Sequence, residues 1–318
     1  MRRCLAVLAA VVVLPVSSAA ARPVRSAIFF YPWYSNPTYD GAYAHWQQGD
    51  HDPPFDVSSV YFPARGAYSS GDPHVLAAQM RDIRRAGVDE VVSSWWGRGS
   101  TEDQRLPAVI AAAHHYRLKV AVQLEPYPGR SPETIAADLQ YIRGLDIRDV
   151  YVYRAGDFTG DQWRSLDLSL TGLRIFAQTN HVGFAAYSGF AGFYTYDILM
   201  YGGEQFGRLC AQAHAVGLLC APSVGPGYDA LAATGDDRVK PRDDGETYDS
   251  MWSAAIDADA DIVTITSYNE WSEGTQIEPA GHGGRYESYN GAYGLHGHKA
   301  EWAYIWATRR WTNVLAKR

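Results

Sequence analysis

Eight short apolar runs alternate with helical patterns along this chain, and this alternation constrains the fold more than any other feature. The runs are rich in β-branched and aromatic residues, as strands are. They are Ser26 to Trp33, Val88 to Trp96, Leu118 to Tyr127, Asp149 to Arg154, Arg174 to Asn180, Gly192 to Ile198, Leu218 to Val224 and Ile262 to Tyr268. Helical spacing of apolar residues follows at Val75 to Ala86, Leu106 to Tyr116, Pro132 to Arg143, Glu204 to Val216, Thr247 to Ala258 and His298 to Leu315.

Strands that are buried on both faces read as nearly continuous apolar runs, and eight strand–helix units are what a (β/α)₈ barrel needs. We therefore predict an α/β chain with a single (β/α)₈ TIM barrel. An open, doubly wound sheet is the alternative. The segment from Ser35 to Asp72 is long and rich in Gly, Pro and Tyr, which predicts a long βα loop on the face where barrel enzymes carry their active sites.

The first residues have the pattern of a secretory signal peptide. A basic start is followed by an apolar run from Leu5 to Val16 and then by small residues from Ser17 to Ala21. The apolar run is shorter than the roughly 20 residues that span a bilayer. We expect residues 1–21 to be removed, residues 22–318 to form the barrel, and the mature protein to be secreted without stable membrane insertion.

Composition restricts the partners. The formal net charge of −7 argues against nucleic acid, which favours a basic surface. The 22 tyrosines and 10 tryptophans offer flat apolar faces with a polar edge, which suit neutral sugar rings. The histidines lack further ligands at a recognisable spacing, so no metal site is expected. We expect a monomer in which Cys210 and Cys220 are two buried thiols, with a disulfide as the alternative.

The chemistry is expected where the strands end, because barrel active sites assemble there. Two carboxylates three residues apart, Glu270 and Glu273, follow the last strand, and Glu125 follows the third. Like charges held close together in a buried cleft cannot both ionise easily, so one group keeps a proton while the other stays a base. That pair is what the cleavage of a glycosidic bond requires.

The run from Ser267 to Glu278, SYNEWSEGTQIE, resembles the signature of glycoside hydrolase family 99, the endo-α-1,2-mannosidases and mannanases. Other matching segments occur in the same order along nearly the whole mature chain. They are Phe30 to Tyr34, Asn36-Pro37, Tyr39 to Gly41, His45-Trp46, Tyr68 to Ser70, Glu125 to Tyr127 and Pro222 to Tyr228. The resemblance implies a (β/α)₈ barrel and a secreted, retaining enzyme that cleaves α-1,2-mannosidic bonds inside a glycan without a metal or other cofactor.

The resemblance also implies roles for individual residues. Glu270 deprotonates the 2-hydroxyl of the sugar, which attacks the anomeric carbon and forms a 1,2-anhydro sugar. Glu273 protonates the departing oxygen and then activates water. The residues that the resemblance places against the substrate are Glu125, Trp95, Tyr34, His45, Tyr153, Tyr194, Tyr196 and Asn269, with Arg242 as a further candidate that could equally be a solvated charge.

Some positions depart from the family pattern. Family members carry His where Ser272 stands, Asn-His where Gln47 and Gln48 follow Trp46, and Tyr-Pro-Pro where Trp96 follows Trp95. We expect these departures to alter sugar subsites and to leave the acid/base pair unchanged. Two other functions stay open: a retaining α-glycosidase that acts on another α-linked glycan, and an inactive barrel that only binds carbohydrate.

Overall fold

The computed structural model describes residues 25–281 and 284–318, so the predicted signal peptide lies outside the described residues. Its main sheet is parallel, in the order β7-β6-β5-β4-β3-β2-β1-β11-β8. The strands are β1 (Arg25–Phe30), β2 (Glu90–Trp95), β3 (Lys119–Leu124), β4 (Asp149–Val152), β5 (Arg174–Gln178), β6 (Gly192–Tyr194), β7 (Leu219–Ala221), β8 (Ser223–Val224) and β11 (Ile262–Ile265). Each of the eight predicted runs contains strand, and the prediction of a (β/α)₈ barrel is confirmed.

Pro222 divides the seventh predicted strand into β7 and β8, because proline has no N–H to give to the ladder. β7 pairs with β6, and β8 pairs with β11 on the other side. The Pro222 carbonyl still accepts a hydrogen bond from the Thr264 N–H at 3.1 Å. This one segment therefore connects the two ends of the sheet and closes the barrel.

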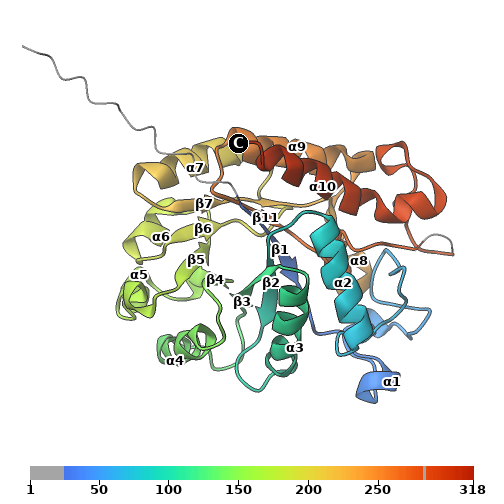
Figure 1. Cartoon of the computed structure of the whole chain (residues 1–318), viewed down its shortest axis with the longest axis horizontal. Coiled ribbons are helices and arrows are strands. Elements are labelled where there is room, and N and C mark those ends of the chain that lie inside the picture. Colours follow the sequence, from blue (N-terminus) through green and yellow to red (C-terminus); the bar gives the residue numbers. More distant parts are fainter. Residues whose placement is uncertain (1–24, 282–283) are drawn as a thin grey trace, which may run out of the picture.

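Helices surround the strands, with α9 and α10 lying along one side of the barrel (Figure 1). They are α1 (Pro37–Asp40), α2 (Pro73–Arg85), α3 (Thr101–His115), α4 (Pro132–Arg143), α5 (Gly160–Arg164), α6 (Val182–Tyr187), α7 (Phe206–Ala215), α8 (Leu231–Thr234), α9 (Glu246–Asp257) and α10 (Ala303–Leu315). α3 begins five residues before its predicted start because the Ser100 side chain caps it by accepting from the Asp103 N–H. A two-stranded hairpin, β9 (Tyr228–Asp229) with β10 (Val239–Lys240), lies on the loop after β8.

Aromatic side chains fill the barrel interior below the strand ends. The Phe29 ring lies 5.8 Å from Tyr151 and 5.5 Å from Tyr194, and Tyr151 stacks on Phe176 at 4.9 Å. All four side chains are fully buried. The barrel interior is therefore a packed core and not an open channel.

Cys210 of α7 and Cys220 of β7 form a disulfide, so the expectation of two thiols is wrong. The helix packs directly against the strand that follows it, which brings the two Cα atoms to 5.1 Å, within the range that a disulfide spans. Among the described helices, none is long and apolar enough to cross a membrane.

Candidate active site

The two glutamates predicted as catalytic lie on the loop after β11, where a short 3₁₀ turn spans Trp271–Glu273. Gly274 ends this turn with a φ of 64°, and a Cβ atom there would lie 2.8 Å from the Asp229 carbonyl oxygen. Glycine is therefore needed both for the turn and for the close approach of β9. The hydroxyl of Ser267 accepts a hydrogen bond from the Glu270 N–H at 2.8 Å, which fastens the start of the loop.

Burial and mutual repulsion set the protonation of these carboxyls. Burial raises the pKa of Glu270 well above its usual value, and the nearby charges of Glu273 and Glu125 raise it further. Burial raises the pKa of Glu273 to about 7, with Asp197 as the second cause. The two groups titrate as a pair, because the charge of Glu273 makes the ionisation of Glu270 less favourable. When a single proton is left on the pair, the site holds one acid and one base.

Ser272 contacts the pair directly, because its hydroxyl donates a hydrogen bond to a carboxylate oxygen of Glu270. This hydrogen bond lowers the pKa of Glu270 against the effect of burial. This departure therefore lies in contact with the acid/base pair itself, and the expectation that it leaves the pair unchanged stays a prediction.

Glu125 follows β3 and faces the same site. Its side chain is 4% exposed, and the Ser94 hydroxyl donates a hydrogen bond to it at 2.8 Å. Burial raises the pKa of Glu125 to about 8, opposed by this hydrogen bond and by Arg130, while Glu273 raises it. Three carboxyls from two loops thus act on one another across a single cleft.

The raised pKa of Glu125 predicts a pH-dependent stability. Its carboxyl stays protonated in the folded protein up to about pH 8, whereas in the unfolded chain it ionises near pH 4.5. Folding therefore becomes less favourable as pH rises between these values, by about 1.4 kcal/mol per pH unit. Glu125→Gln removes this dependence and should gain stability over the wild type from pH 5 to pH 8. Urea unfolding of both proteins at pH 5 and at pH 8 measures the two free energies of unfolding. A difference between variant and wild type that is the same at both pH values would contradict the prediction.

Tyrosines line a cavity of about 210 Å³ that borders Glu273. Tyr153 and Tyr196 are among its lining residues, and their rings lie 5.2 Å apart in an edge-to-face contact. The Tyr196 hydroxyl also contacts the Tyr31 hydroxyl inside the site. These positions agree with the expected substrate contacts of Tyr153 and Tyr196, whose roles stay predictions.

His45 lies on the opposite loop, stacked on Trp33 with their ring centres 4.5 Å apart. Burial lowers the pKa of His45 to about 4, with Arg105 as the second cause. The imidazole is therefore neutral at physiological pH and can accept or donate a hydrogen bond to a sugar hydroxyl.

Asn269 and Tyr34 brace the loop. The Asn269 amide donates to the Tyr31 carbonyl at 3.0 Å and accepts from the Tyr31 N–H at 2.8 Å. The buried Tyr34 hydroxyl donates to the Asn269 carbonyl at 3.0 Å and accepts from the Trp271 N–H at 3.1 Å. Both side chains therefore tie the glutamate loop to the end of β1, a role that the sequence did not predict.

Trp95 is fully buried on the outer side of the barrel, where its indole donates to Asp103 at 2.8 Å and its ring stacks on Tyr141. Ser94, one residue earlier, points to Glu125 instead. Trp96 is one residue past the end of β2, and continued alternation of the side chains predicts that it shares the face of Ser94. This placement favours Trp96 over Trp95 as the tryptophan of this strand that borders the cleft.

The structure brings to the site one tryptophan that was not among the predicted site residues, Trp33, whose ring lies 4.6 Å from that of Tyr31. Trp33 and Trp96 are partly exposed, yet each has a buried indole N–H without a hydrogen-bond partner among the described residues. The sequence signal for Trp96 was its spacing, because side chains two residues apart, such as Ser94 and Trp96, point to the same face of a strand. Tyr194, by contrast, is fully buried in the aromatic packing of the barrel interior.

Arg242 lies behind the glutamate loop and not as a solvated charge. Its guanidinium donates to the carbonyls of Gly274 and Gln276, each at 2.8 Å. Three tyrosine rings enclose the guanidinium carbon at 4.6 to 4.7 Å, those of Tyr61, Tyr289 and Tyr304. These contacts hold the chain just after Glu273, which gives Arg242 a positioning role, and its expected contact with the substrate stays a prediction.

Among the residues that the structure describes, no group of three or more His, Cys, Asp or Glu side chains could hold a metal ion.

Comparisons with known proteins agree with this geometry. The family model for glycosyl hydrolase family 99 matches residues 24–155 and 163–317. A glycoprotein endo-alpha-1,2-mannosidase of Mus musculus is 30% identical over 310 aligned residues, covering 79% of this chain and 67% of that protein. One from Xenopus laevis is 32% identical over 311 aligned residues, covering 80% of this chain and 69% of that protein.

A solved structure extends the agreement to the fold. The family 99 endo-alpha-mannosidase from Bacteroides thetaiotaomicron superposes with a TM-score of 0.80 at 26% identity, covering 92% of this chain and 98% of that chain. The resemblance seen in the sequence is confirmed, and so is the prediction of a glycoside hydrolase. The chain belongs to glycosyl hydrolase family 99.

Proposed function

We propose that the protein hydrolyses α-1,2-mannosidic bonds inside a glycan, with retention of the anomeric configuration. The observation that carries the proposal is the pair Glu270 and Glu273, two buried carboxyls on the one loop after β11 whose pKa values are raised by burial. The names of the mouse and frog relatives support the choice of linkage.

In the proposed first step, the Glu270 carboxylate takes the proton of the sugar 2-hydroxyl as O2 attacks C1. The bond from C1 to the departing oxygen breaks, and Glu273 gives its proton to that oxygen. A 1,2-anhydro sugar forms. In the second step Glu273, now a carboxylate, deprotonates the water that attacks C1, and the proton on Glu270 returns to O2.

The binding of substrate decides which of the two carboxyls ionises. In the free protein burial favours the protonated form of both. A sugar 2-hydroxyl that donates a hydrogen bond to Glu270 favours its carboxylate. The proton then stays on Glu273, where the departing oxygen needs it.

The test is incubation with α-1,2-linked mannan and with a glucosylated α-1,2-mannoside, with the first-formed product followed by NMR. Internal cleavage that releases an α-configured product supports the proposal. A β-configured first product would contradict retention. If the protein cleaves other α-linked glycans in a panel but not these two substrates, the proposed α-1,2-mannosidic linkage is wrong.

Arg242 should matter for turnover because it holds the two carbonyls just after Glu273. Arg242→Met should lower kcat by about tenfold to a hundredfold with a smaller change in KM, since small displacements of a catalytic group are costly. Arg242→Lys should recover part of the loss. Arg148→Met is the matched control, because Arg148 is exposed and pairs only with Asp146. Equal losses in kcat and in substrate affinity, without recovery in the lysine variant, would contradict a positioning role.

We also infer that the protein is exported after removal of residues 1–21. The disulfide between Cys210 and Cys220 supports this inference, because disulfides persist in oxidising compartments. Mass spectrometry of the secreted protein should find Arg22 at its N-terminus; recovery of the full chain inside the cell would contradict it.

A further inference from the structure

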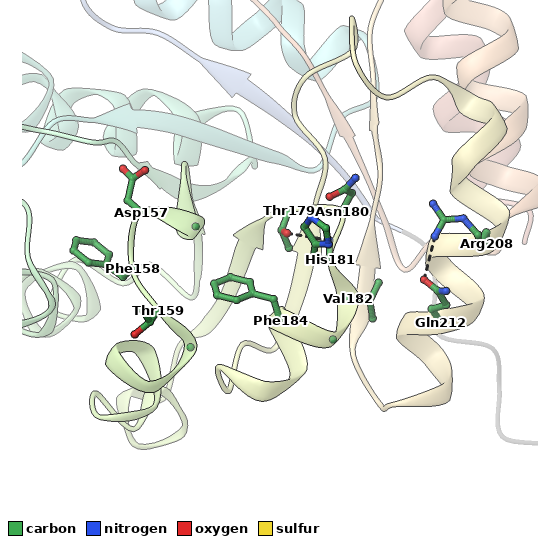
Figure 2. Close-up of a pocket in the computed structure, with 13 residues that line it drawn as sticks. Asp157, Phe158, Thr159, Thr179, Asn180, His181, Val182, Phe184, Arg208 and Gln212 are labelled. Carbon is green, nitrogen blue, oxygen red and sulfur yellow. Dashed lines mark hydrogen bonds between the residues drawn. The ribbon is translucent and has the colours of Figure 1, made fainter.

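A second hollow, of about 800 Å³, opens on the loops that follow β4 and β5. Figure 2 shows its walls: Phe158 comes from the loop after β4, Asn180 and His181 follow β5, Phe184 lies on α6, and Arg208 lies on α7. Loops that follow barrel strands share one face of the molecule. The hollow therefore opens on the face that carries the glutamate pair, although none of its lining residues belongs to the site described above.

Arg130 joins the hollow to the cleft. Its side chain is only 3% exposed, and it donates to the Tyr153 carbonyl at 2.8 Å and to the Asp157 carboxylate at 2.8 Å. Its guanidinium lies 5.5 Å from the centre of the Phe158 ring, in the wall of the hollow. The same charge lowers the pKa of Glu125 in the cleft. One buried side chain thus contacts Phe158 in the wall of the hollow and interacts electrostatically with Glu125 in the cleft. The hollow and the cleft are therefore neighbours.

The lining has the chemistry of a site for a neutral polyhydroxyl ligand. Phe158 and Phe184 present half-buried rings, on which the C–H faces of sugars pack. The Asn180 amide and the His181 ring have no hydrogen-bond partner among the described residues, so both are available to hydroxyl groups.

The hollow offers little free charge. Asp157 is paired with Arg130 and Arg154, and the single further cation among the described lining residues, Arg208, donates a hydrogen bond to the neutral side chain of Gln212. A polyanion such as nucleic acid would need several free cations, which this lining does not offer.

We propose that this hollow is a distal glycan-binding subsite, which holds mannose units of the same substrate chain several residues away from the bond that is cleaved. The identity of the sugar rests on the proposed function. A chain that leaves the cleft past Tyr153 meets the hollow across Arg130. The arrangement favours long substrates over short ones, as internal cleavage requires.

The double variant Asn180→Ala/His181→Ala tests the subsite, because these side chains lack hydrogen bonds that the fold needs. For long α-1,2-mannan, kcat/KM should fall about tenfold, whereas the shortest cleavable oligosaccharide should be processed at the wild-type rate. Trp306→Ala is the control, since it removes a 47% exposed aromatic ring from α10, away from the hollow. Equal effects on long and short substrates, or no effect on either, would overturn the proposal.

Binding measurements separate this proposal from the proposed function. Calorimetric titration of α-1,2-mannan into full-length Glu273→Gln protein, with and without the double substitution, reports on the hollow without hydrolysis. Affinity that falls about tenfold with the double substitution supports the subsite even if the wild type cleaves no mannan. Unchanged affinity overturns it even if mannan is cleaved.

Discussion

Glu273→Gln is expected to lower kcat on a mannan substrate by about a thousandfold, because glutamine cannot protonate the departing oxygen. The amide has nearly the shape of the carboxyl, so binding should change little and the loss should lie in kcat. Initial rates on α-1,2-mannan measure it. Glu204→Gln is the matched control, because it makes the same chemical change at an exposed glutamate.

The leaving group distinguishes the two carboxyls. A substrate whose departing group needs no proton, such as a glycosyl fluoride, should recover much of the activity of Glu273→Gln. Glu270→Gln should stay inactive on both substrates, because the 2-hydroxyl still lacks its base. A Glu273→Gln protein that keeps more than a tenth of wild-type kcat on mannan would sink the assignment of the acid.

Glu278→Ala is expected to lower the free energy of unfolding by about 3–5 kcal/mol, the cost of breaking a buried ion pair. Glu278 is fully buried and accepts from Arg65 at 3.0 Å, Gln79 at 3.0 Å, Tyr68 at 2.8 Å and Trp271 at 3.0 Å. Without the carboxylate these donors lose this common acceptor, and the largely buried Arg65 charge loses one of its two carboxylate partners, the other being Asp82. Urea unfolding at pH 7 measures the loss.

Glu278→Gln should cost less than Glu278→Ala, because its amide oxygen still accepts from part of the cluster. Glu204→Ala again provides the control at an exposed site. Since Trp271 lies between the two catalytic candidates, kcat should also fall in the folded variants. A loss of stability below about 1 kcal/mol in Glu278→Ala would show that the cluster does not support the loop.

Much of the fold could be predicted from the sequence, because local signals fix its elements. Each predicted run contains strand, and caps such as Ser131 mark helix starts. The strands end earlier than predicted at several places, as at Phe30, where the aromatic run continues past the last ladder pairing into the rim. Strand propensity extends through such residues, but only the neighbouring strand decides where pairing stops.

The candidate site was less predictable, because its members meet through tertiary contacts. The Asn269 amide and the Tyr31 backbone bind each other across 238 residues of sequence. The motif shows that Asn269 is present but not whether its amide faces a sugar or a strand end. Arg242 is a similar case, since its partners are carbonyls more than 30 residues away.

The sequence by itself determined the alternation of strands and helices, the pair Glu270 and Glu273 at a strand end, and the family. These depend on the order and spacing of residues in one segment at a time. Only the tertiary structure decided that Ser94 points to Glu125 while Trp95 points outward to Asp103, and that Cys210 meets Cys220. The physical reason is that the closure of the barrel sets which alternate side chains point inward, and a shift of one residue exchanges the two faces.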